Sequence, residues 1–128
     1  MKPEAQRIAI AEAYGWTAVQ SGPSKWGGTE IIGVSPSNKG KRDIDQLPLA
    51  YHEVPNYPFD LNAMQEAEKI LTDEQRGQMM DALCEIVRRD HNPEAGPMTA
   101  IIAAFFATAA QRAEAFLRTL GLWKEESQ

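Results

Sequence analysis

Cysteine is almost missing from this 128-residue chain, since Cys84 is the only one. No disulfide can form within the chain, and the usual structural zinc sites, which take two or more thiolates, are excluded. Cys84 lies beside Leu83 in the middle of a predicted helix, where we expect it to be buried as a small apolar residue rather than activated as a nucleophile. These features predict a protein of a reducing compartment that uses neither zinc nor a catalytic thiol.

Long apolar runs are also lacking. The most apolar stretch, 98–110, is about 13 residues long, whereas a helix that crosses a bilayer needs about 20. Residues 1–13 carry Glu4, Arg7 and Glu12, which interrupt the apolar core that a signal peptide requires. We therefore expect a soluble, cytoplasmic protein that makes no contact with a membrane.

Positive charge is in short supply. The chain has 13 Lys and Arg against 18 Asp and Glu, which gives a net charge of -5. A negative mean field repels phosphate, so no direct contact with nucleic acid is expected. The length fits one domain over 1–128, which can bury over about 60 % of its unfolded surface without help from a metal.

Recognised catalytic motifs are absent as well. The two histidines, His52 and His91, stand in no metal-binding spacing, and no serine sits in a nucleophile-elbow sequence. We therefore predict that the protein is not an enzyme and holds no cofactor and no metal. The alternative is a divalent-metal enzyme built on His52 with Glu53, Asp43 and Asp45.

The elements that the sequence does contain divide the chain into a β-rich and a helical part. A helix is predicted over 3–14, and Gly15 suits the left-handed position after its end. Glycine and proline then interrupt the chain up to Pro48, so 16–54 is read as strands and loops. The strand candidates are 29–34, which is the strongest, then 16–20 and 49–54.

From Asp60 onward the chain reads as helix. Helices are predicted over 61–71 and 73–90, and a last one over 98–120 or only 108–120. Apolar residues keep helical spacing across 98–120, which favours one continuous helix, but 98–107 also suits a separate short helix or a buried strand. The predicted fold class is α+β, helix-dominated, with three to four helices packed on a small antiparallel sheet.

Eight residues are candidates for binding. Trp26, in a glycine-rich loop, is the strongest candidate for an interface, because an exposed tryptophan is costly unless used. The cations Lys39, Lys41 and Arg42 could hold a phosphate or an acidic partner, although a short charge run is usually a solvated turn.

The remaining candidates lie further along the chain. Tyr57 sits in a proline-stiffened loop that delivers a helix start at Asp60 and Asn62, a suitable floor for a partner or a small anion. The alternative is that Tyr57 and Phe59 only close the end of the core while Asp60 caps the helix. Arg112 joins these residues as a candidate for anion binding.

Three blocks resemble the phage ABA sandwich family of small phage and prophage proteins. They are 10–16 (IAEAYGW), the Pro55-Asn56-Tyr57 turn that leads to 60–64 (DLNAM), and 107–117 (ATAAQRAEAFL) followed by Leu120-Gly121. The chain departs from the pattern in 21–46 and 72–106. The resemblance implies a small α/β sandwich of phage origin and carries over no catalytic residue.

These observations favour a non-catalytic phage or prophage accessory protein that acts by binding a host or phage protein. The resemblance alone implies the cytoplasm of an infected or lysogenic bacterium and inhibition of a host defence system as the role. A second hypothesis is a protein that binds or sequesters a nucleotide or another small anion. The oligomeric state is not readable from the sequence.

Overall fold

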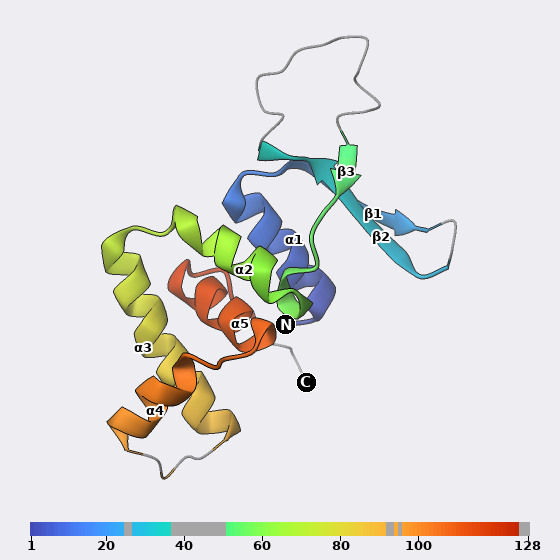
Figure 1. Cartoon of the computed structure of the whole chain (residues 1–128). Coiled ribbons are helices and arrows are strands. Elements are labelled where there is room, and N and C mark those ends of the chain that lie inside the picture. The colour runs from blue at the N-terminus through green and yellow to red at the C-terminus, as the bar shows by residue number, and fades with distance from the viewer. Residues whose placement is uncertain (25–26, 37–50, 92–93, 95, 126–128) are drawn as a thin grey trace.

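A computed structural model describes residues 1–24, 27–36, 51–91, 94 and 96–125. A small three-stranded sheet lies at one end of the molecule, and the helices gather at the other (Figure 1). The fold is α+β and dominated by helices, as predicted. The elements in chain order are α1 (Pro3–Tyr14), β1 (Thr17–Pro23), β2 (Thr29–Val34), β3 (Tyr51–Glu53), the 3-10 turn η3 (Tyr57–Phe59), α2 (Leu61–Ala67), the 3-10 turn η4 (Glu68–Ile70), α3 (Asp73–Asp90), α4 (Pro97–Ala104) and α5 (Ala109–Thr119).

The sheet is antiparallel in the order β1-β2-β3. β1 and β2 pair from Thr17 opposite Val34 to Pro23 opposite Thr29, with an irregularity between Thr17 and Gln20. β2 has the bounds predicted for the strongest strand, and β1 extends further than the predicted 16–20. β3 is shorter than the predicted 49–54, of which residues 49 and 50 lie outside the described part.

Helix α1 fixes the sheet to the helical part. It ends at Gly15, whose φ of 115° lies in the left-handed region and whose N–H donates to the carbonyls of Ala11 and Glu12. The guanidinium of Arg7 donates to the carbonyl of Val54 at 2.9 Å and to that of Pro55 at 3.2 Å. These bonds hold the chain that leaves β3 against α1.

Helix α5 forms the centre of the helical part, between α1 and α2 on one side and α3 on the other (Figure 1). Most of its side chains are buried, and they include the largest fully buried side chain of the described residues, Phe116. After Gly121 the chain turns back, and the N–H groups of Leu122 and Trp123 donate to the carbonyl of Leu117. Trp123 thus closes the C-terminal end of α5.

Of the three alternatives for 98–107, the structure has the separate short helix, not the favoured continuous helix over 98–120. Thr108 has an extended backbone (φ -72°, ψ 162°), and a capping box with Gln111 begins a new helix there. The segments Met98–Ala104 and Ala109–Thr119 meet at 108°. The predicted helix 61–71 likewise divides, into α2 and the turn η4, whereas α3 has the predicted bounds. The described residues therefore form five α-helices, not three or four.

No single helix in the described ranges is long and apolar enough to cross a membrane. The bent pair Met98–Ala104 and Ala109–Thr119 passes the same test by length and composition alone.

Tyr57 is a core residue, which corrects its assignment as a surface contact. Its side chain is only 2 % exposed, and its hydroxyl accepts a hydrogen bond from Nε1 of the buried Trp16 at 3.2 Å. Burial raises the pKa of the Tyr57 hydroxyl, so it stays protonated at neutral pH. Phe59, by contrast, is 69 % exposed and does not close the core.

We predict that Tyr57→Ala lowers the free energy of unfolding by about 3–5 kcal/mol, because it empties a large buried site. Tyr57→Phe should cost only about 1 kcal/mol, the value of the lost hydrogen bond. Urea unfolding measures both. Phe59→Ala is the control on an exposed ring, and it should stay within about 0.5 kcal/mol of the original protein. Equal stability of Tyr57→Ala and Phe59→Ala would contradict this placement.

Candidate functional site

The four cationic and aromatic candidates of the first loops lie outside the described residues. They are Trp26, Lys39, Lys41 and Arg42. Asp43 and Asp45, offered as metal ligands, lie outside them too, and His52 and Glu53 are exposed on β3. Among the described residues no group of three or more His, Cys, Asp or Glu could hold a metal ion.

The other four candidates occupy four different environments. Tyr57 lies in the core. Asp60 caps α2, where its Oδ1 accepts from the N–H of Ala63 at 3.1 Å, and Asn62 is exposed on the first turn. Arg112 is held in an ion pair with Glu68, in a cavity at the other side of α2. The helix start therefore serves its own cap, as the alternative reading of Asp60 held.

Cys84 is half-buried on α3 rather than fully buried. Burial, followed by the negative charge of Asp81, raises the pKa of its thiol. A raised pKa favours the thiol over the nucleophilic thiolate. Cys84 thus has a protonated side chain at neutral pH, which is the opposite of what a catalytic cysteine needs.

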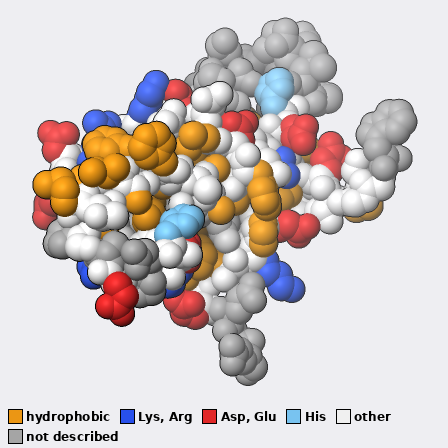
Figure 2. Space-filling view, turned by 60° about the horizontal axis from the view of Figure 1, so that its bottom comes forward, with side chains coloured by type: hydrophobic (Ala, Val, Ile, Leu, Met, Phe, Trp, Pro, Cys, Tyr) orange, Lys and Arg blue, Asp and Glu red, His pale blue; other side chains and the backbone are white. Residues whose placement is uncertain are grey.

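The most prominent surface feature is an apolar face on α4 and the turn after it. Ala100 and Ala104 are buried, whereas the large side chains of the helix point outward. Figure 2 shows these side chains as a continuous hydrophobic band along the part of the surface that α4 forms. We call it the α4 face. Its members are Met98 (69 % exposed), Ile101 (42 %), Ile102 (54 %), Phe105 (74 %) and Phe106 (83 %).

The size of the α4 face marks it as unusual for a free surface. A phenylalanine carries about 150–250 Å² of buriable area, so the two rings alone leave on the order of 300 Å² in water. The largest apolar patch on a typical monomer is about 300–600 Å² and is often functional. With its three aliphatic members, the α4 face reaches the upper part of that range.

A shallow groove of about 370 Å³ runs between the α4 face and α3. Ile101 and Ala100 line it on one side, and Asp81 and Glu85 line it on the other, together with Arg88. Within the described part of the chain neither of these two carboxylates forms an ion pair. The groove therefore joins an apolar surface to two carboxylates that form no ion pair among the described residues and to one cation, Arg88, which leaves it with a net negative charge.

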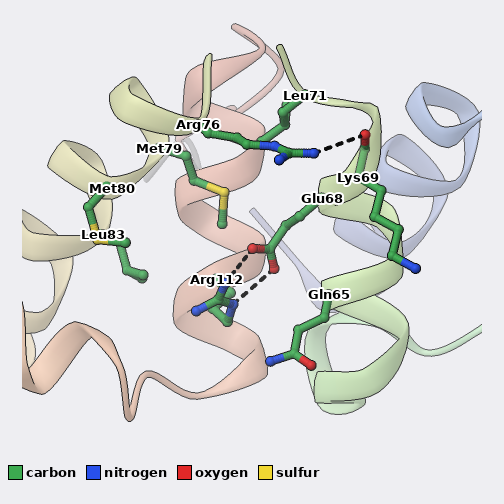
Figure 3. A pocket seen from close by; sticks show the side chains of 9 residues that line it. All are labelled: Gln65, Glu68, Lys69, Leu71, Arg76, Met79, Met80, Leu83 and Arg112. Atoms are coloured by element: carbon green, nitrogen blue, oxygen red, sulfur yellow. Dashed lines mark hydrogen bonds and ion pairs between the residues drawn. The ribbon is translucent and has the colours of Figure 1, made fainter. Parts of the chain in front are cut away.

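A second cavity, of about 380 Å³, lies between α2 with η4, α3 and α5 (Figure 3). The bidentate Arg112–Glu68 pair stands in its wall, and both side chains are nearly buried, at 18 % and 14 % exposed. Of the four candidate binding residues that the structure describes, Arg112 alone lines this cavity.

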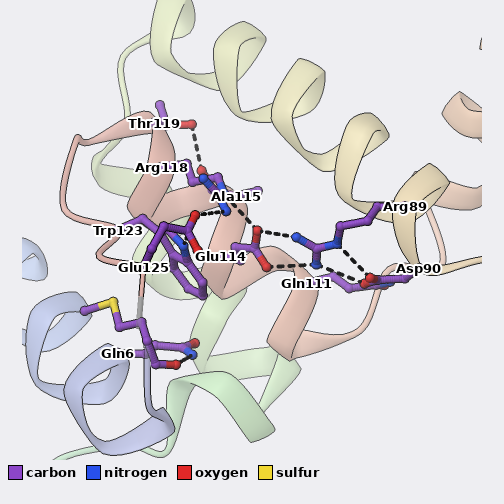
Figure 4. Close-up of polar contacts among 11 residues, drawn as sticks. Gln6, Arg89, Asp90, Gln111, Glu114, Ala115, Arg118, Thr119, Trp123 and Glu125 are labelled. Carbon is purple, nitrogen blue, oxygen red and sulfur yellow. Dashed lines mark hydrogen bonds and ion pairs between the residues drawn. The ribbon is translucent and has the colours of Figure 1, made fainter. Parts of the chain in front are cut away.

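A polar cluster around Glu114 on α5 ties the C-terminal end of α3 to α5 (Figure 4). The Glu114 carboxylate accepts from Arg89 at 2.8 and 3.0 Å and from Arg118 at 2.7 Å. Burial raises the pKa of Glu114, but the hydrogen bonds and charges of both arginines together lower it below its ordinary value of 4.5. Asp90 and Gln111 extend this network, which holds the two helices in register.

Comparison of the chain with family models, with curated proteins and with solved structures finds no match.

Sequence reasoning missed the α4 face, although a signal for it exists. Between Met98 and Ala107 the only polar residue is Thr99. A short helix that is apolar on all sides has more apolar surface than one neighbouring helix can bury. The large residues at 98, 101, 102, 105 and 106 also have the spacing of one helix face. The same residues were taken instead as the start of the core helix.

We predict that Glu114→Gln lowers the free energy of unfolding at pH 7 by about 1.5–3 kcal/mol, because charge-assisted bonds from two arginines are weakened. The lowered pKa of Glu114 stabilises the fold above pH 4.5 and loses this effect as the pH falls through the folded-state value. The difference in the free energy of unfolding between Glu114→Gln and the original protein should therefore be smaller at pH 3.5 than at pH 7, as measured by urea unfolding. Glu12→Gln, on an exposed part of α1, is the control; an equal effect of both substitutions would refute the role of Glu114.

Proposed function

We propose that this chain is a non-catalytic binding protein that docks a partner protein on its α4 face. The observation that carries the proposal is the set of five large apolar side chains held outward by a helix whose small residues face inward. Such a patch is characteristic of a surface that a partner covers. A standard interface buries about 800 Å² on each partner, and the α4 face with its groove supplies most of that area.

The charges beside the α4 face select the kind of partner. Asp81 and Glu85 outnumber Arg88 in the groove, so an apolar surface flanked by lysine or arginine complements its net negative charge best. A second copy of this chain would place the same carboxylates against each other, and an anionic membrane would be repelled by them. The partner is therefore a protein that presents a basic amphipathic helix, which lays its apolar side on α4.

The resemblance to phage ABA sandwich proteins suggests a biological role for this proposed binding. The partner would be a host protein in the cytoplasm of an infected or lysogenic bacterium, and inhibition of a defence system would follow from covering that protein's helix. This extension depends on likeness alone and is separate from the chemistry of the α4 face.

We predict that the double substitution Phe105→Ser and Phe106→Ser weakens binding of a labelled amphipathic peptide at least about tenfold, since aromatic anchors dominate such interfaces. The probe is an 18-residue helix with leucine on one side and lysine on its flanks, followed by fluorescence anisotropy. Both rings are exposed, so the variant should unfold at the same temperature as the original. Phe59→Ser, which removes an exposed ring outside α4, should bind the peptide normally.

Charge variants and other probes complete the test. Asp81→Asn with Glu85→Gln should weaken binding several-fold at low salt and less at high salt. A peptide with glutamate in place of lysine should bind more weakly than the basic one. A dimer that dissociates on the two phenylalanine substitutions, or binding to phosphatidylserine vesicles that they abolish, would overturn the choice of partner. Equal peptide binding by Phe105→Ser/Phe106→Ser and Phe59→Ser would overturn the site itself.

A further inference from the structure

The cavity between α2, α3 and α5 has a wall made of two chemically different halves (Figure 3). It receives no residue from α4, so it is a separate site from the α4 face. A volume of about 380 Å³ falls in the range of small-molecule sites, about 300–1,000 Å³.

The apolar half comes from α3 and from Leu71, which follows η4. Met79, Leu83 and Leu71 are almost fully buried and form its floor, while Met80 is 39 % exposed at its edge. Methionine side chains are flexible and polarizable, so they adapt to apolar groups of varied shape. This half of the wall suits an alkyl or aryl body.

The polar half is cationic. Nε of Arg112 donates to Oε2 of Glu68 at 2.9 Å, and a second bond joins Nη2 to Oε1, so the single carboxylate of the lining is already neutralised. Lys69 pairs with Glu66 at 2.8 Å. The lining thus carries three cations, Lys69, Arg76 and Arg112, against one anion, Glu68, in a chain whose net charge is -5.

Arg76 is the cation whose charge has no partner. Its Nη2 approaches the backbone carbonyl of Lys69 at 3.4 Å, and across the described residues no carboxylate lies within ion-pair distance of it. Figure 3 shows this guanidinium at one end of the cavity, beyond the Arg112–Glu68 pair and close to Met79. A guanidinium in this place can donate two hydrogen bonds to one planar carboxylate.

We propose that this cavity binds a small amphiphilic monocarboxylate, with its apolar body on Met79, Met80 and Leu83 and its carboxylate on Arg76. The available space corresponds to roughly a dozen water-sized groups, since a water occupies about 30 Å³. That is the size of a medium-chain fatty acid or an aryl-alkanoic acid. Arg112 forms part of the polar wall, but its guanidinium is paired with Glu68 and does not bind the carboxylate of the ligand.

The same lining argues against a nucleotide. None of its nine residues is aromatic, so a base would find no ring on which to stack, and Arg76 is the single cation of the lining without a carboxylate partner among the described residues, which suits one carboxylate better than a polyphosphate. The cavity therefore refines the earlier hypothesis of a small-anion site. It keeps Arg112 in the wall and adds Arg76 as the residue that meets the anion.

The test is calorimetric titration of the full chain with decanoate. We expect decanoate to bind and acetate, inorganic phosphate and ATP not to bind. Arg76→Gln should weaken decanoate binding at least tenfold, whereas decan-1-ol, which lacks the charge, should bind both proteins equally. Lys2→Gln removes the same charge from an exposed position far from the cavity in sequence and should leave decanoate binding unchanged.

Two further variants separate the outcomes. Met80→Ala should weaken decanoate and decan-1-ol to the same extent, since it removes part of the apolar wall. Phe105→Ser/Phe106→Ser should change neither, because α4 does not line the cavity. If that double variant abolishes decanoate binding, the fatty acid binds the α4 face and the inference fails. It fails equally if Arg76→Gln binds decanoate normally, or if phosphate or ATP binds as tightly. The last two results do not bear on peptide binding at α4.

Discussion

The capping box at Thr108 determines how the C-terminal part of the chain folds, and both proposed sites depend on it. Thr108 Oγ1 accepts from the N–H of Gln111 at 3.1 Å, and Gln111 Oε1 accepts from the N–H of Thr108 at 3.0 Å. These bonds satisfy two donors that the start of a helix leaves open. The extended backbone at Thr108 therefore ends one helix and begins another at 108°, which sends α5 into the centre of the helical part.

The position of α4 follows from this break. A helix of eight residues that cannot continue into the core can contact α3 along one side only. Ala100 and Ala104 take that side, because small residues allow the two helices to approach closely. The large apolar residues are left outside, although burying each of them would contribute about 1.5–3 kcal/mol. That unrealised free energy is available to a partner that covers the α4 face.

Short-range sequence patterns, such as caps and apolar spacing, predicted most helices and strands. The features that they did not predict depend on contacts between residues far apart in the chain. Both capping boxes and the bounds of α3 could be read from short spacings. At 98–120 two local signals disagreed: the apolar periodicity ran through Thr108, while the cap interrupted it. The cap prevailed because it satisfies specific backbone donors, whereas periodicity only states which side is apolar.

The candidate sites were harder to predict because they join segments far apart in the chain. For Tyr57 the sequence allowed both a binding residue and a core residue, and its contact with Trp16, 41 positions away, belongs to the core. Arg112 was identified as a candidate, yet its partner Glu68 lies 44 positions away. No spacing within the sequence indicates such a pair. Of the α4 face only the composition was visible, because its exposure depends on the direction that α5 takes.

Helix α3 separates the two sites and gives each its charge. Arg76, Met79 and Leu83 line the cavity, whereas Asp81 and Glu85 line the groove on another side of the same helix. This arrangement places positive charge toward the proposed carboxylate and negative charge toward the proposed basic helix. α3 has 18 residues and a capping box at its start, and the Glu114 cluster ties its C-terminal end to α5. Coupling between the two sites would require a second arrangement of α3 that one ligand favours, and neither proposed site calls for α3 to move. The two sites should therefore be filled independently.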